Sequence, residues 1–596
     1  MSSRVHLKKH DQNGISMSPT AGTLSGIVSF LFGGALKNNS RHAGFMIAEL
    51  FKAHGVEFVF CLSGGHISPI LVGSKSAGIK VIDVRHEVNA VFAADAVARV
   101  TGVPGVAIVT AGPGVTNTIT AIKNAEMAES PLVLIGGSSP IMLKGQGALQ
   151  DINQREVIEP IVKKCWSITT VRDILPSLRE AFQVAQSGTP GPVFVELPID
   201  ILYSYLFIAS NTGLVVQKSK EQITEQDLPN IIIPSDYEDG SDSGNNNNNN
   251  NKVSSNSTNS KKSRNSNAAK MAYLESLWSG APVYLTKDKN DTSSGGVFND
   301  IANSASGGGG AASLSGMVTE KVLQMYMRWL FVDGQEKVDI TPLPITIPIS
   351  PPEDVETTAG FIMKSSRPLL IMGSQSMACV SKIDEMVRSI ESMGIPCFLG
   401  GRSRGALGRN NPLHIRQNRS AALKQSDCVI LVGAYADFRL NYGSSLPSKA
   451  NIVSINRDNA KLHLNSNMIW TPSLLSEGDP CTFLIELAAS IQTNGKFEEW
   501  RKVLKENDMV KIKENHKHGE QPVFARWMDA SNKNGGNKSP GKKVEMINPI
   551  KLLEVVDSSL PENTILIADG GDFVGTAAKV LSPTKPLGWL DPGPYV

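Results

Sequence analysis

The sequence of 596 residues lacks the paired ligands of a structural metal site. Its six cysteines, at positions 61, 165, 379, 397, 428 and 481, include no CxxC, and a close histidine pair, His516 and His518, lies in a lysine-rich polar stretch. Structural zinc needs Cys or His pairs at short spacing, so we do not expect it. Several cysteines stand inside apolar runs, which indicates buried thiols in a reducing compartment.

A block of like charge is also missing. Lys and Arg total 58 against 56 Asp and Glu, a net charge of +2. No basic arm is available for a polyanion, so nucleic acid is not expected as a partner. No apolar strand leads into a G-x-G-x-x-G turn, which argues against a nicotinamide-dependent enzyme.

Long hydrophobic runs are absent as well. The longest run near the N-terminus, 21–36, has 16 residues with four glycines. That is shorter than the ~18 to 20 residues that span a bilayer. Lys9 and Lys37 flank it. We therefore read residues 1–40 as a leader, and two interpretations of it stay open, a membrane anchor or a Gly-rich disordered segment.

Residues 41–205 show a regular alternation of short β-branched runs with helical segments. Apolar runs begin at residues 56, 80, 106, 131 and 192, and helical patterns cover 87–102, 115–128 and 173–188. We expect the runs to be buried strands of a parallel sheet covered on both faces. Functional loops would then lie at the carboxyl ends of the strands.

The rest of the chain divides by composition. Residues 206–316 form an Asn/Ser/Gly-rich insertion, which we predict to be disordered because it cannot bury enough apolar surface. A second doubly wound α/β domain is expected over 352–493, a polar linker over 494–547, and the start of a third α/β unit over 548–596. With fewer than 50 residues after Asn548, that third domain is expected to be incomplete.

An amphipathic helix and connector are predicted over 317–351. Val318, Val322, Met325, Trp329 and Leu330 fall on one face of this helix. Such a face would pack on its own domain or lie at a membrane interface.

Glu87 is the leading candidate for a functional residue. It directly follows an expected strand and opens an apolar helix, at the carboxyl edge of the sheet. The helix dipole alone favours Glu in that position. It does not explain the Gly112-Pro113-Gly114 turn, which ends the next strand and would face the same crevice.

These motifs resemble a known family. The series His-Glu, Ala-Ala-Asp-Ala-x-Ala-Arg, Thr-Gly and Gly-Pro-Gly-x-x-Asn, from 86 to 117, is similar to the pyrimidine-binding domain of the thiamine-diphosphate enzymes. The stretch 408–443 resembles their 2-hydroxyacyl-CoA lyase and oxalyl-CoA decarboxylase branch, in particular the acetolactate synthase-like 2-hydroxyacyl-CoA lyase 2 group. The resemblance covers about 41–205 and 317–596, and implies successive doubly wound parallel-sheet domains.

The resemblance implies roles for single residues. Glu87 matches the glutamate that hydrogen-bonds the cofactor's aminopyrimidine ring. Gln150 matches a glutamine that donates to a developing oxyanion, although a surface-loop amide is an equal alternative. His66 would be a proton donor, unless it is a capping or structural histidine. The remaining cofactor-binding candidates, which we read as loop formers that let backbone approach the ring, are Gly64, Gly65, Gly112, Gly114 and Asn117.

The resemblance fails at the diphosphate half of the site. Family members hold the diphosphate and Mg²⁺ through Gly-Asp-Gly followed by Asn, and this sequence has no such motif; 569–572 matches only the entry strand. We therefore assign thiamine diphosphate and Mg²⁺ as cofactors but no metal ligand. Arginines in 402–409, with Arg416 and Arg419, could meet CoA or nucleotide phosphates such as those of FAD or ADP, or form a solvated basic face.

The implied activity is cleavage of a 2-hydroxyacyl-CoA to an aldehyde and formyl-CoA, a step suited to fatty acid α-oxidation. Whether this chain is active by itself stays open, because its third domain is expected to be incomplete. Two alternatives stay open: an acetolactate synthase-type carboligase acting on 2-oxo acids, and a non-catalytic paralogue that pairs with a complete subunit. The family assembles its sites between subunits, so we expect a homodimer or tetramer. The expected location is intracellular, at the endoplasmic reticulum membrane if 21–36 anchors the chain, and otherwise in the mitochondrion or cytoplasm.

Deleting residues 236–312 tests the predicted insertion. Because a disordered loop adds little to stability, the deletion should leave the melting temperature and activity almost unchanged. Differential scanning calorimetry would check this, and a large fall in melting temperature would show that the insertion is packed.

Overall fold

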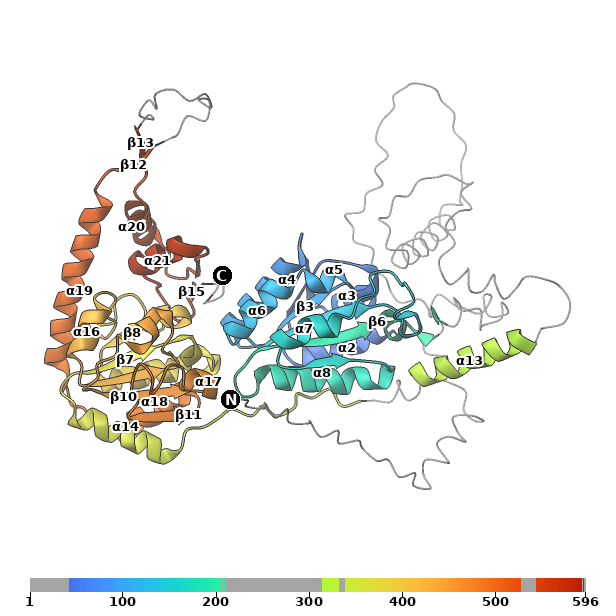
Figure 1. Ribbon diagram of the computed structural model, residues 1–596, viewed down its shortest axis with the longest axis horizontal. Coiled ribbons are helices and arrows are strands. Elements are labelled where there is room, and N and C mark those ends of the chain that lie inside the picture. The colour runs from blue at the N-terminus through green and yellow to red at the C-terminus, as the bar shows by residue number, and fades with distance from the viewer. Residues whose placement is uncertain are drawn as a thin grey trace, which may run out of the picture.

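The computed structural model describes residues 42–205, 207–208, 314–331, 338–526, 543–591 and 593. The leader 1–40 and nearly all of the predicted insertion lie outside the described residues, as does the run 21–36. Within the described part, two parallel sheets flanked by helices form an N-terminal and a central domain, and a smaller C-terminal unit follows (Figure 1). No helix of this part combines the length and apolar character needed to cross a bilayer.

The N-terminal domain is a six-stranded parallel sheet in the order β2-β1-β3-β4-β6-β5. Its strands are β1 (Phe58–Cys61), β2 (Lys80–Asp83), β3 (Gly105–Val109), β4 (Leu132–Ser138), β5 (Cys165–Ser167) and β6 (Pro192–Pro198). Its α-helices are α2 (Ala43–Ala53), α3 (Ser68–Ser76), α4 (Glu87–Thr101), α5 (Pro113–Thr116), α6 (Ile119–Met127), α7 (Gln154–Ile158), α8 (Val171–Gln186) and α9 (Ile199–Leu202). Short 3₁₀ turns are η1 (Gly65–Ile67), η2 (Ile141–Leu143) and η3 (Glu159–Ile161). Apolar side chains from opposite faces of the sheet form two separate cores.

Two edge strands differ from the expected pattern. The run beginning at residue 80 was predicted to be buried, but β2 pairs only with β1 and most of it is solvent-exposed. An edge strand has one free side, and here its polar residues face solvent. The opposite edge, β5, has no counterpart in the predicted runs because it is three residues long.

The central domain has a five-stranded parallel sheet in the order β11-β10-β9-β7-β8. Its strands are β7 (Pro368–Met372), β8 (Cys397–Leu399), β9 (Cys428–Val432), β10 (Asn451–Asn456) and β11 (Leu474–Glu477). Helices α14 (Pro352–Lys364), α15 (Ile383–Met393), α16 (Arg419–Gln425), α17 (Asn459–Leu462) and α18 (Pro480–Ser490) surround it, with 3₁₀ turns η5 (Ser374–Met377), η6 (Val380–Lys382), η7 (Gly401–Gly405) and η8 (Phe438–Gly443).

All six cysteines are free thiols, and all but the half-buried Cys379 are buried.

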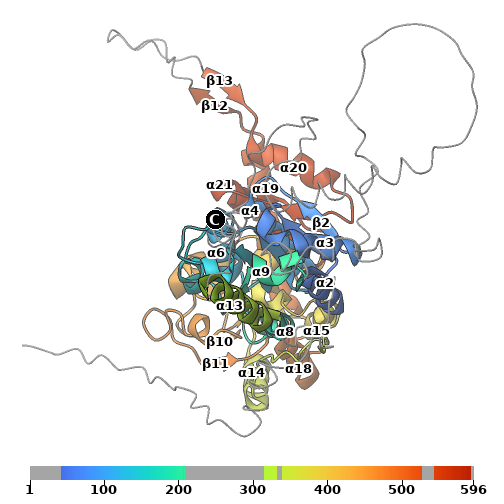
Figure 2. The same ribbon diagram turned by 90° about the vertical axis from the view of Figure 1, so that its right-hand side faces the viewer.

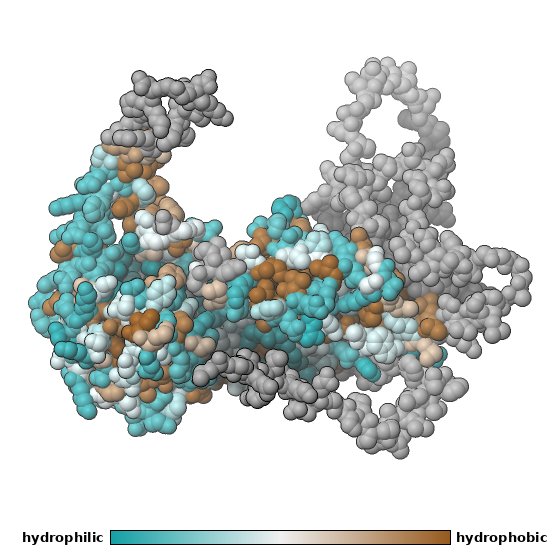
Figure 3. Space-filling model, in the orientation of Figure 1, coloured by the Kyte–Doolittle hydropathy of each residue, from teal (hydrophilic) through white to brown (hydrophobic). Residues whose placement is uncertain are grey.

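A long helix replaces much of the expected polar linker. Helix α19 (Glu498–Gly519) runs along the outer edge of the central domain, and its outer face is mostly hydrophilic (Figures 1 and 3). Trp500 and Leu504 are buried against the domain, and the Trp500 indole donates to the carbonyl of Pro368 at 3.0 Å. These two anchors are four residues apart in a highly charged sequence. The composition of the segment therefore indicated a linker and gave no sign of a packed helix.

The C-terminal end of helix α13 (Leu314–Phe331) contacts α8, and the rest of α13 extends beyond the end of α8 (Figure 1). Its buried side chains are Met327, Leu330 and Phe331. On the predicted apolar face, Leu330 is buried, but Val322, Met325 and Trp329 are exposed, and the Val318 side chain lies outside the description. The helix is turned so that the Tyr326 hydroxyl donates to buried Asp200 at 2.6 Å. The packed face is therefore rotated from the predicted one.

The C-terminal unit comprises α20 (Pro549–Ser559), β14 (Leu566–Ile567), α21 (Gly571–Val580) and β15 (Trp589–Leu590) around the buried Trp589. An antiparallel hairpin of β12 (Val523–Arg526) and β13 (Lys543–Met546) projects beyond the end of α19 (Figure 2). Arg416 donates to the carbonyls of Lys579, Val580 and Leu581 at 2.7 to 3.2 Å. Arg416, for which phosphate binding and a solvated basic face were both left open, therefore holds the C-terminal end of α21.

The three units meet at the C-terminal end of α4. Arg99 forms a buried ion pair with Asp95 at 2.6 Å, and its side chain also donates to the carbonyl of Asp591 at 2.7 Å. Arg402 of the central domain donates to the Arg99 carbonyl. A second contact joins Lys461 to Glu129 of the N-terminal domain. One helix thus connects the three units.

We predict that Asp95→Asn lowers the free energy of unfolding by about 3 to 5 kcal/mol, because it leaves the buried Arg99 charge without its partner. Urea unfolding would measure it. The control Asp83→Asn breaks a surface pair with Arg85 and should cost less than about 1 kcal/mol. Equal losses in the two variants would contradict the role of the buried pair.

Candidate active site

The carboxyl ends of four strands converge on one edge of the N-terminal sheet. His66 follows β1, Glu87 follows β2, Gly112 follows β3, and the loop with Gln150 follows β4. The connections leave β1 and β3 in opposite directions, because β1 leads to β2 on one side and β3 to β4 on the other. In doubly wound sheets, the crevice at such a switch point is where ligands bind.

Glu87 is the first residue of α4 and is only 6% exposed. The positive end of the helix dipole favours a carboxylate there. Asn117, at the C-terminal end of α5, donates from Nδ2 to Glu87 Oε2 at 2.9 Å. The other oxygen, Oε1, faces the turn at Gly114, where an added Cβ would lie 3.7 Å away. One carboxylate oxygen is therefore held by Asn117 while the other borders the glycine turn.

Three predicted loop glycines occupy places where a side chain cannot fit. A Cβ on Gly64 would lie 2.6 Å from Thr110 Cβ, and one on Gly114 would lie 2.9 Å from Thr110 Cγ2. Gly112 has a left-handed φ of 62°, and its Cβ would lie 2.6 Å from the carbonyl oxygen of Gln150. The backbone turns are thus packed closely around Thr110, a residue that sequence reasoning missed. Its only signal was a polar residue ending an apolar run.

His66 contacts Thr110, the side chain on which these turns pack. Its Nδ1 is 3.2 Å from Thr110 Oγ1, and it is buried within η1, which Gly65 opens. Burial lowers the pKa of His66 below its usual value, because the charged imidazolium is disfavoured away from water. The ring is therefore neutral near pH 7 and carries one N–H for donation.

Gln150 is brought directly over the Gly112 turn. It has a left-handed φ of 59°, and its Cβ would be 3.0 Å from a Cβ on Gly112. The structure therefore gathers all the predicted site residues of the N-terminal domain at the carboxyl edge of its sheet. Their individual roles stay predictions.

Gln154 is the second functional candidate that sequence reasoning missed. It is 1% exposed, and its side-chain Oε1 accepts from the backbone N–H of Gly112 at 2.8 Å. Its only sequence signal was a second glutamine four positions after Gln150 in a polar segment.

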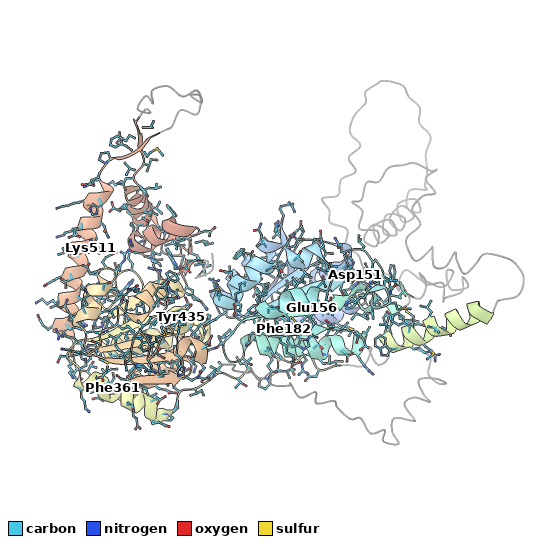
Figure 4. The ribbon with its side chains drawn as sticks, viewed as in Figure 1. Asp151, Glu156, Phe182, Phe361, Tyr435 and Lys511 are labelled. Atoms are coloured by element: carbon cyan, nitrogen blue, oxygen red, sulfur yellow. The ribbon has the colours of Figure 1, made fainter. Side chains whose placement is uncertain are left out.

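A cavity of about 260 Å³ lies where the central domain faces the N-terminal domain. The turns after β7, β8 and β9 line it. Five arginines and two acidic residues also line it: Arg99, Arg402, Arg404, Arg419, Arg439, Glu129 and Asp591. Tyr435, another lining residue, is labelled in Figure 4. Burial, with repulsion from Arg99, lowers the pKa of Arg402 to about 9. The buried Nε atoms of Arg402 and Arg404 have no hydrogen-bond partner within the described ranges. This concentration of positive charge suits an anionic ligand.

Among the described residues, no group of three His, Cys, Asp or Glu side chains is placed to hold a metal ion. At Asp569-Gly570-Gly571, the Asp569 carboxylate accepts from the N–H of Gly570 at 2.8 Å. That aspartate therefore makes a local contact with the residue that precedes α21.

Sequence comparisons identify the family. Residues 41–157 match "Thiamine pyrophosphate enzyme, N-terminal TPP binding domain", and residues 355–472 match "Thiamine pyrophosphate enzyme, central domain". The 2-hydroxyacyl-CoA lyase 2 of Danio rerio is 38% identical over 96% of this chain and 74% of its own length. The chain belongs to the thiamine pyrophosphate enzymes.

Other relatives in this family carry two kinds of name. The 2-hydroxyacyl-CoA lyase 2 of Homo sapiens is 37% identical over 94% of this chain and 71% of its own length. The acetolactate synthase large subunit IlvG of Mycobacterium tuberculosis is 41% identical, but over only 27% of this chain and 30% of its own. The lyase-named relatives therefore match nearly the whole chain, and the synthase a single part of it.

The residues at the carboxyl edge of the N-terminal sheet fit the pyrimidine half of thiamine diphosphate. A flat ring needs backbone close to its faces and hydrogen-bonding groups at its edge. The Gly114 turn brings backbone beside Glu87 Oε1, and the Glu87 carboxylate, held by Asn117, offers the hydrogen-bonding group. Fold and family were thus both predicted correctly from the sequence.

Replacing Gly112 tests the close packing of the turns. Gly112→Ala should lower the melting temperature clearly more than Gly145→Ala. Both glycines have a left-handed φ, with a strain of about 1 to 2 kcal/mol for Ala, but only at Gly112 does the new Cβ collide with Gln150. Thermal unfolding of the two variants measures the difference. Equal shifts would contradict the packing described here.

Proposed function

We propose that this chain is a thiamine-diphosphate-dependent carbon–carbon lyase that cleaves a 2-hydroxyacyl-CoA to an aldehyde and formyl-CoA. The observation that carries the proposal is the buried Glu87 carboxylate, fixed by Asn117 beside the glycine turns at the sheet's switch point. The lyase names of relatives that align with over nine-tenths of the chain support the choice of reaction.

Glu87 would hold the cofactor through Oε1. Asn117 occupies Oε2, so Oε1 is the atom available to a ring nitrogen, and a carboxylate there can hold and return a proton. The bound cofactor supplies the electron sink that carbon–carbon cleavage requires. The chain's own task is to fix the ring and exclude water.

The remaining site residues would act on the substrate. The Gln150 amide can donate to an oxygen on which negative charge develops. Neutral His66 can donate from its ring N–H, and Thr110 sets the orientation of the ring through its contact with Nδ1. We assign Mg²⁺ to the cofactor's diphosphate and assign no described residue to the metal.

The arginine-lined cavity would take a phosphate-bearing nucleotide. CoA of the substrate carries such phosphates, and a separate FAD or ADP would present the same chemistry. Arg402, Arg404, Arg419 and Arg439 supply guanidinium groups suited to phosphate oxygens.

The direct test is an assay of the full chain with thiamine diphosphate, Mg²⁺ and a 2-hydroxyacyl-CoA, with the aldehyde and formyl-CoA as measured products. Glu87→Gln should cut turnover by about 10²-fold or more, because it removes the group that holds the proton. Glu156→Gln, at an exposed glutamate on α7 labelled in Figure 4, is the matched control and should keep full turnover.

Two outcomes would overturn parts of the proposal. Condensation of two 2-oxo acids without acyl-CoA cleavage would assign the acetolactate synthase-type reaction instead. Near-normal turnover in Glu87→Gln would remove Glu87 from the mechanism.

A further inference from the structure

Gln154 joins three strand ends through one buried amide. Its Oε1 accepts from the N–H of Gly112, after β3, at 2.8 Å. Its Nε2 donates to the carbonyl of Gly137, in β4, at 3.1 Å and to Glu196 Oε1, in β6, at 2.8 Å. Gln154 itself opens α7, between the residues Asp151 and Glu156 labelled in Figure 4. We call this arrangement the Gln154 clamp.

The orientation of the Gln154 amide is fixed by its neighbours. The Gly112 N–H can only donate and the Gly137 carbonyl can only accept, so the amide oxygen faces Gly112 and the NH₂ group faces Gly137 and Glu196. Only a side chain that donates on one side and accepts on the other satisfies both groups, and a buried group left unsatisfied is costly.

The clamp also reaches the loop that carries Gln150. Lys144, in this loop, donates to the second oxygen of Glu196 at 2.9 Å. Most of the loop between Met142 and Leu149 is exposed, so few apolar contacts hold it. Gln150 packs against Gly112, and the Gly112 N–H donates to Gln154. The polar chain Lys144–Glu196–Gln154–Gly112 therefore links the loop to the turn beneath it.

We infer that Gln154 is a positioning residue, which sets the Gly112 turn under Gln150 and thereby fixes where the Gln150 amide can meet a reacting oxygen. The consequence for the reaction rests on the function proposed above. The positioning itself is a property of the free chain and is measurable without cofactor or substrate.

Gln154→Glu is the sharpest test because it keeps the shape and changes the donor. An ionised Glu still accepts from Gly112, but it repels Glu196 and cannot donate to it. When the two carboxylates share one proton, a donor returns, so the defect should shrink as the pH falls. Hydrogen exchange of the full chain, corrected for the intrinsic pH dependence, should show protection of residues 140–152 about tenfold lower than in the wild type at pH 8 and closer to it at pH 6.

Gln146→Glu is the matched control, since it adds the same charge to an exposed position of the same loop and touches no clamp atom. It should leave the exchange unchanged. Lys144→Met serves as a second variant if Gln154→Glu fails to fold. Because Lys144 is 37% exposed, its loss should spare folding and still raise exchange in the loop.

In the loaded enzyme, Gln154→Glu should lower kcat more at pH 8 than at pH 6 while changing KM little. The inference would be overturned if a folded Gln154→Glu variant exchanged its loop amides at pH 8 as slowly as the wild type does. If that variant does not fold, unchanged loop exchange in Lys144→Met would overturn it instead. Altered exchange without any lyase turnover in the wild type would reject the proposed function and keep the clamp.

Discussion

The close packing of bare backbone around Thr110 is the constraint on which the site depends. Gly64 and Gly114 approach this side chain so closely that any Cβ would collide with it, and Gly112 does the same toward Gln150. Because these turns end neighbouring parallel strands, their fit brings Glu87, His66 and Gln150 to one edge of the sheet. The absence of side chains on these glycines is what allows the turns to pack so closely.

Helix α4 ties this edge of the sheet to the rest of the molecule. Its first residue is Glu87, where the helix dipole favours a carboxylate, and its last turn carries Arg99, which contacts both the central domain and the C-terminal unit. Arg99 also lines the arginine-rich cavity. A ligand in that cavity and a ring beside Glu87 would therefore contact opposite ends of one rigid helix.

The local pattern of apolar residues predicted the regularly alternating strands and helices. The alternating apolar runs predicted both parallel sheets, and the start of α4 at Glu87 and its end near Gly102 could be read from the sequence. The packed face of α13 could not, because a hydrogen bond from Tyr326 to a distant Asp200 rotates the helix. Gln154 was missed for the same reason, since its partners Gly112, Gly137 and Glu196 come together only in the folded sheet.

The most direct test of the central claim is calorimetric titration of the full chain with thiamine diphosphate and Mg²⁺, compared between the wild type and Glu87→Gln. The account predicts saturable binding to the wild type and affinity about tenfold or more weaker in the variant, because a charged hydrogen-bond partner of the ring is lost. Equal affinities in the two proteins, or no saturable binding to the wild type, would contradict it.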